Sequence, residues 1–130
     1  MISKTEFFRR AAQAGSDSEP GWTGCVDANW DAAVATARIL ESGMPSIGIL
    51  SERRRIACFL AVCSQIDSLM ESGQLTLDSA MLAQHILMLS SSNYSKARSA
   101  FMHRAPNISW QEAVDLPQMA LEWFKAARGR

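Results

Sequence analysis

Hydrophobic residues recur along the chain at the three- and four-residue spacing that is typical of amphipathic helices. The longest stripe includes Phe59, Cys63 and Ile66. No window keeps the two-residue alternation of a half-buried strand for long, and β-branched residues are scarce. The pattern therefore predicts an all-α protein of six or seven helices joined by short loops.

Capping residues and glycines mark where these helices should begin and end. Ser51 and Thr76 precede two of the stripes, and Ser3 and Ser109 each stand three residues before a glutamate, as in a capping box. The second helix is expected to begin at Asp27 or Asn29, after a loop over residues 16–25, and Ser92 or Asn93 should cap the fifth. Expected helices cover residues 3–15, 27–43, 51–73, 76–90 and 92–105, and two short ones begin at 109 and 117.

Two similar stretches, ILESGMPSI and LMESGQLTL, raise the question of a helical repeat. Two copies are fewer than the roughly three that a solenoid needs, so we interpret them as one helix-ending pattern used twice. In that pattern Gly43 and Gly73 would each adopt the left-handed conformation. A length of 130 residues with 48% hydrophobic content suits one domain. We therefore expect a single compact, non-solenoid helical bundle over residues 1–130.

Signals for export, membrane insertion and metal binding do not stand out. The start, MISKTEFFRR, carries early charges and no apolar run of signal-peptide length. The longest apolar run, residues 56–63, is far shorter than the roughly twenty residues of a membrane helix. Cys25, Cys58 and Cys63 match no zinc or redox spacing. These features predict a cytoplasmic protein with reduced cysteines, no membrane partner, no cofactor and no metal.

Charge is unevenly distributed although the chain has a formal net charge of zero. Residues 1–78 hold seven basic and ten acidic side chains, which gives −3. Residues 79–111 contain no acid, and Lys96, Arg98 and Arg104 give that stretch +3. This is where an anionic partner would bind, whether an acidic protein surface or a phosphate backbone, although a solvated face is an equally good interpretation.

The candidate contact residues are the basic side chains of this stretch and of a second cluster. Three consecutive arginines open the long third helix, where the positive end of the helix dipole disfavours cations. They pair with acids elsewhere, serve a partner, or simply keep the surface soluble. The predicted binding residues are Lys96, Arg98, His103 and Arg104, with Arg53, Arg54 and Arg55 behind them.

One short stretch, RSAFMH, raises an enzymatic alternative. Arg98 and His103 resemble the Arg-x4-His motif of the HEPN family of small all-helical ribonucleases. The resemblance implies an imidazole acid or base and a guanidinium that stabilises phosphorane charge. Ser99 stands where that family usually has a larger polar residue, and helical spacing aligns Arg98 with Tyr94 and Phe101. We keep this activity as an alternative and predict that the protein is not an enzyme.

The second half resembles another family. LDSAMLAQHIL at 77–87, SAFMHR at 99–104 and DLPQM at 115–119 occur in an order similar to FlhD, the helical subunit family of the bacterial flagellar master activator. The resemblance covers about a third of the chain. It implies a helical dimer that joins a second subunit to activate transcription, with DNA contact shared by that partner. It assigns no DNA-contacting residue here.

These features favour a non-enzymatic interaction protein, most concretely a regulatory subunit that acts through protein partners. Nucleic acid is a further possible partner, through residues 79–111, and a homodimer is one possible form of assembly. The alternative is an inhibitor or immunity protein that blocks a toxin, nuclease or defence complex. Its working surface would be an acid-rich segment next to two tryptophans, namely Asp17, Glu19, Asp27 and Asp31 with Trp22 and Trp30.

Overall fold

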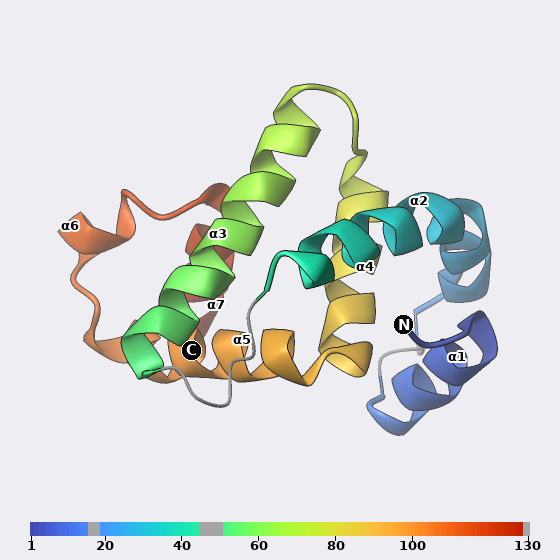
Figure 1. Cartoon of the computed structure of the whole chain (residues 1–130), viewed down its shortest axis with the longest axis horizontal. Helices are drawn as coiled ribbons and strands as arrows, with labels where there is room; N and C mark the ends of the chain where they lie inside the picture. The colour runs from blue at the N-terminus through green and yellow to red at the C-terminus, as the bar shows by residue number, and fades with distance from the viewer. Residues whose placement is uncertain (16–18, 45–50, 129–130) are drawn as a thin grey trace.

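The computed structural model describes residues 1–15, 19–44 and 51–128. These residues form seven α-helices and one 3-10 helix and no strand, so the predicted all-α bundle is confirmed (Figure 1). The elements are α1 (Lys4–Gln13), α2 (Trp22–Ser42), α3 (Glu52–Glu71), α4 (Leu77–Ser90), α5 (Ser92–Arg104), η2 (Ala105–Asn107), α6 (Trp110–Ala113) and α7 (Gln118–Arg128).

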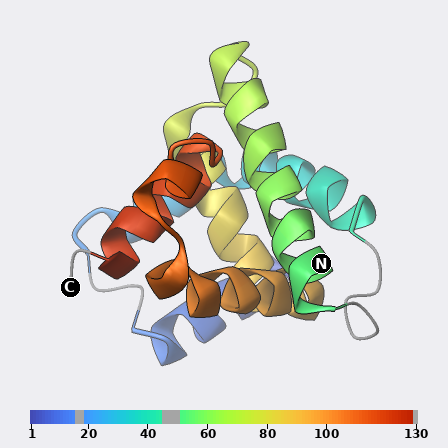
Figure 2. The same ribbon diagram turned by 90° about the vertical axis from the view of Figure 1, so that its left-hand side faces the viewer.

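The helices pack mainly against partners that are not their neighbours in sequence. α2 makes its most extensive contacts with α4. α3 makes its most extensive contacts with α5 and its next most extensive with α7. In Figure 1, α3 and α4 rise to a shared turn, and α5 runs across below them. Figure 2 shows the red α7 and the green α3 above the orange α5. This crossing brings the first turn of α3 onto the middle of α5.

Most predicted helix starts are confirmed by side-chain caps. The hydroxyls of Ser51 and Thr76 accept hydrogen bonds from backbone N–H groups three residues later, at 3.4 and 3.2 Å. Ser109 caps α6 in the same way, at 3.2 Å, and Ser3 caps α1 at 3.1 Å. The Glu6 carboxylate does not complete the α1 capping box, because it bonds to two arginines of its own helix.

Three boundary predictions are wrong. α2 begins at Trp22 and not near Asp27, because Gly21 adopts a left-handed conformation (φ 79°) that starts the helix without a side-chain cap. The hydroxyl of Ser91 caps α5, so the expected caps lie inside its first turn. Gly73 is left-handed as expected, but Gly43 has φ −84° and continues the right-handed helical conformation.

One aromatic cluster forms around Phe59 of α3, which is fully buried. Its ring stacks on Phe101 of α5, with centroids 5.0 Å apart, and on Trp123 of α7 at 5.1 Å. The Tyr94 ring lies 6.0 Å away. This cluster ties α3, α5 and α7 together, and we refer to it as the Phe59 cluster.

A second aromatic cluster forms around Phe7 of α1. The Phe7 ring packs 5.3 Å from Trp30, 5.3 Å from His85 and 6.0 Å from Trp22. α4 joins this Phe7 cluster to the Phe59 cluster, because His85 belongs to the first and its neighbour Gln84 accepts a hydrogen bond from the Tyr94 hydroxyl. The buried hydrophobic side chains form one continuous core.

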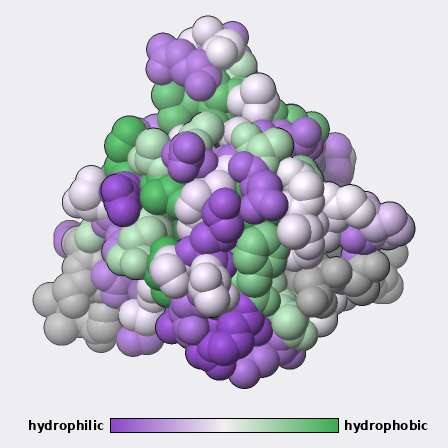
Figure 3. All heavy atoms as spheres, turned by 90° about the vertical axis from the view of Figure 1, so that its right-hand side faces the viewer, coloured by the Kyte–Doolittle hydropathy of each residue, from purple (hydrophilic) through white to green (hydrophobic). Residues whose placement is uncertain are grey.

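Hydrophobic side chains also remain on the surface. On the face drawn in Figure 3 they lie in separate patches between polar groups. Leu77 and Met81 of α4 are exposed, as are Ile39 of α2 and Trp110 of α6. Among the helices that the structure describes, none is both long enough and apolar enough to cross a membrane.

Candidate functional site

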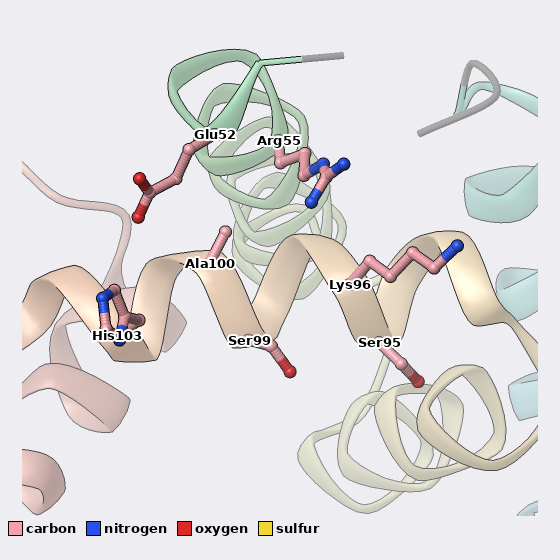
Figure 4. Close-up of a pocket in the computed structure, with 7 residues that line it drawn as sticks. All are labelled: Glu52, Arg55, Ser95, Lys96, Ser99, Ala100 and His103. Carbon is pink, nitrogen blue, oxygen red and sulfur yellow. The ribbon is translucent and has the colours of Figure 1, made fainter. Parts of the chain in front are cut away.

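A groove of about 490 Å³ lies where the first turn of α3 crosses α5. We call it the basic groove. Figure 4 shows its lining residues, of which α3 supplies two and α5 supplies the rest. They are Glu52 and Arg55 from α3, and Ser95, Lys96, Ser99, Ala100 and His103 from α5.

Helical spacing explains why three of these α5 residues lie along one side of the helix. Lys96, Ala100 and His103 follow one another at intervals of four and three residues, which places them along one side of a helix. Ala100 lies between them under the end of α3, where its small side chain leaves room for the close crossing (Figure 4). The polar and charged side chains on either side of it therefore border an open groove.

A second hollow adjoins the basic groove and shares Glu52 with it. It has a volume of about 320 Å³ and is also lined by Arg53, Ile56 and Arg104. Counting both hollows, four cations (Arg53, Arg55, Lys96, Arg104) and one carboxylate line them, a formal charge of +3 in a chain whose net charge is zero. The two hollows thus bring together five of the seven predicted binding residues, with the carboxylate of Glu52 among them.

Three of the four cations, Arg53, Lys96 and Arg104, are exposed. His103 is exposed beside them, and none of these four side chains takes part in the ion pairs of the described part of the chain. Arg55 is half-buried at the end of the groove where Lys96 lies, while the Glu52 side chain extends toward the His103 end (Figure 4). Lys96 thus lies at the end of the groove away from the Glu52 carboxylate.

Two predicted binding residues lie outside these hollows. Arg54 is exposed but lines neither of them. Arg98 packs its guanidinium over the Trp123 ring, 4.4 Å from the ring centre, and lines a separate apolar cavity. Arg98 lies outside the groove because it follows Lys96 by two residues on α5. Two residues correspond to a rotation of about 200° around the helix axis, so the two side chains point in nearly opposite directions.

The same geometry bears on the ribonuclease alternative. Arg98 and His103 are five residues apart, which is about 140° around a helix. His103 lines the basic groove, whereas Arg98 lines the apolar cavity. Within one chain the two side chains therefore do not converge on a common point where a phosphate could react.

The acidic surface of the inhibitor alternative lacks its expected aromatic anchors. Trp22 and Trp30 are half-buried and pack on Phe7 in the core. Asp27 forms an ion pair with Lys4 at 3.1 Å. Asp31 and Glu19 are exposed, and Asp17 lies outside the described residues.

The apolar cavity brings together groups that the sequence did not connect with one another. It is lined by residues of four helices (α2, α4, α5 and α7) and by Ala14, which caps the end of α1; among them are Trp22, Gln84, His85, Arg98 and Trp123. Burial lowers the pKa of His85, so its imidazole is uncharged at neutral pH. A glutamine in the middle of an apolar helix is the one signal that could have drawn attention to this cavity.

No close group of three or more histidine, cysteine, aspartate or glutamate side chains that could hold a metal ion occurs among the described residues. Searches of family models, curated proteins and solved structures found no match to this chain. The resemblances to FlhD and HEPN proteins therefore stay predictions from short motifs.

Proposed function

We propose that this protein is a non-enzymatic regulatory subunit that binds nucleic acid through the basic groove and works together with a protein partner. The concentration of positive charge where α3 crosses α5 is the observation that carries the proposal. Phosphate backbones are recognised mainly by exposed lysine and arginine side chains, which release condensed counterions when they bind. The groove offers such side chains on two rigid helices.

The shape of the groove supports contact with a backbone more than with a small anion. Its basic side chains are spread over both hollows, and the two ends of the α5 row, Lys96 and His103, are about 10 Å apart along the helix axis. An extended polyanion can follow such a row, whereas a single phosphate would contact only one part of it.

Two observations favour binding over catalysis. The Arg98 and His103 side chains line different cavities, so the one motif with catalytic chemistry is divided. The acidic group in the groove, Glu52, has no second carboxylate beside it in the lining of either hollow. The proposal therefore assigns the groove a positioning role in a regulatory assembly.

The test is fluorescence anisotropy with a short labelled DNA duplex over a series of salt concentrations. If the three exposed cations contact phosphates, the slope of log affinity against log salt should be about −2.7. That slope corresponds to a loss of affinity of about 40-fold between roughly 50 and 200 mM salt. Single-stranded RNA of the same length, with a slope nearer −2.1, distinguishes the form of nucleic acid.

Variants make the test specific to the groove. The double variant Lys96→Gln, Arg104→Gln should reduce the size of the slope by about 1.8, because two phosphate contacts are lost. Arg38→Gln is the matched control, since Arg38 is an exposed arginine of α2 that lines neither hollow. An equal loss in the control, or an affinity that does not respond to salt, would remove the proposal.

A further inference from the structure

The apolar cavity lies between the Phe7 cluster and the Phe59 cluster and opens on a different face of α5 from the basic groove. Its volume is about 460 Å³, within the range of roughly 300–1,000 Å³ that is typical of small-molecule sites. α4 forms one long wall, and residues of α2, α5 and α7, with Ala14 just after α1, close the rest. This inference does not depend on the function proposed above.

The walls of the cavity are suited to an apolar molecule. Leu82, Met88 and Leu89 of α4 line it, together with Val26 of α2. Met81 lines it as well and is 51% exposed, so it stands at the opening. Methionine side chains are unbranched and polarisable, which lets them adapt to ligands of different shape.

Three buried N–H groups in the lining residues are without hydrogen-bond partners among the described residues. They are the indole Nε1 of Trp22, the amide Nε2 of Gln84 and the guanidinium Nε of Arg98. Buried donors of this kind are rarely left unpaired in folded proteins. All three are donors, so the group that complements each of them is a hydrogen-bond acceptor.

Gln84 is the most informative of the three residues because it is only 3% exposed. Its amide oxygen accepts the hydroxyl hydrogen of Tyr94. The Nε2 donor is thereby left for another group. A core made only for stability would place an apolar side chain here, since an unpaired buried amide destabilises a fold.

The charges of the lining residues indicate the sign of the ligand. Arg98 contributes a permanent positive charge. His85 is uncharged at neutral pH because burial lowers its pKa. Asp78 is the only acid in the lining and is exposed in the first turn of α4, about 9 Å along the helix axis from Gln84.

We propose that this cavity binds a small organic acid with an apolar body, such as a medium-chain fatty acid, as its carboxylate. The carboxylate accepts hydrogen bonds from Arg98, Gln84 and Trp22, and its two oxygens have enough lone pairs for all three donors. The hydrocarbon chain packs on the leucine and methionine side chains of α4.

Titration calorimetry with decanoate tests the proposal, with decanol as the uncharged control. Saturable binding of one decanoate per chain is expected, and decanol should bind at least about tenfold more weakly because it cannot form the charge-assisted bonds. In two-dimensional NMR spectra the indole N–H resonance of Trp22 should shift with decanoate. Hexanoate, octanoate and dodecanoate then report how much chain the cavity accepts.

Arg98→Gln should weaken decanoate binding by roughly ten- to a hundredfold, whereas decanol binding should hardly change. Lys96→Gln is the matched control, because Lys96 lies on α5 but faces the basic groove. It should leave decanoate affinity unchanged, and the loss of nucleic-acid binding in that variant is a separate result. The two proposals can therefore fail independently.

A second variant covers the case in which Arg98→Gln does not fold. Met81→Trp places a larger side chain at the opening of the cavity, at a position exposed enough to accept it. It should reduce decanoate affinity about tenfold or more by filling the space. Equal affinity for decanoate and decanol, no binding of any acid in the series, or full binding by folded Arg98→Gln protein would each overturn the proposal.

Discussion

A double-mutant cycle across the Arg98–Trp123 contact is expected to give a coupling free energy of about 1 kcal/mol. The guanidinium carbon of Arg98 lies 4.4 Å from the centre of the Trp123 ring. Exposed cation–π contacts contribute about 0.5–1 kcal/mol and desolvated ones about 2 kcal/mol. Arg98 is half-buried, which places this pair between the two limits.

The single substitution Arg98→Met should change the free energy of unfolding by less than about 1 kcal/mol in either direction. It removes the cation–π attraction, which is destabilising. It also removes the buried Nε–H that has no partner among the described residues, which is stabilising by about 1–3 kcal/mol where no water reaches the group. Methionine keeps an unbranched apolar side chain over the indole. Because these effects oppose each other, only the cycle isolates the contact.

Urea unfolding of the wild type, Arg98→Met, Trp123→Leu and the double variant provides the four free energies, followed by far-ultraviolet circular dichroism. Lys125 and Trp110 form the control cycle, because they are exposed and the ammonium lies 5.9 Å from the ring centre. Their coupling should stay below about 0.5 kcal/mol. Equal couplings in the two cycles, or less than about 0.3 kcal/mol for Arg98–Trp123, would refute the reasoning.

Three further results are expected. Phe59→Ala should lower the free energy of unfolding by about 3–5 kcal/mol, because it empties the centre of the Phe59 cluster. Ala61→Ser, on the exposed side of α3, is the control and should have little effect in the same urea experiment. Thr76→Ala should cost about 1 kcal/mol through loss of the α4 cap, and an unchanged midpoint would show that this cap is dispensable. Burial raises the pKa of the Cys63 thiol from 9.0 to about 12. A thiol reagent should therefore modify exposed Cys25 in the folded protein and reach Cys63 only in urea. The same pKa shift stabilises the fold below pH 9, and that contribution is lost as the pH rises toward 12.

Local interactions explain which parts of the fold were predictable. Ser51 and Thr76 cap helices through their own side chains, so the residue type identified the position. The start of α2 was missed because Gly21 acts through its backbone conformation, which many loop glycines share. The sequence predicted Ser92 or Asn93 as the cap of α5, whereas the cap is Ser91. Three adjacent polar residues can all serve as caps, so residue type alone does not distinguish them.

The candidate site was predictable only in its charge. Lys96 and Arg104 were identified because residues 79–111 lack acids, which is a property of one segment. Glu52 lines the groove because α3 crosses α5, and nothing in a linear pattern specifies that crossing. The grouping of Arg98 with Trp22 and Gln84 depends on how four helices pack together, and no linear pattern specifies that packing either.

The pairing of each helix with one further along the chain has a consequence for synthesis on the ribosome. The buried face of α3, which carries Phe59, is covered by α5 and α7 and only slightly by α4, although α4 follows it directly. A nascent chain that has produced α3 therefore exposes this face until Phe101 and Trp123 have been added. Fragments that stop earlier should be prone to aggregation and proteolysis, so these helices should fold cooperatively and only after α7 has been made.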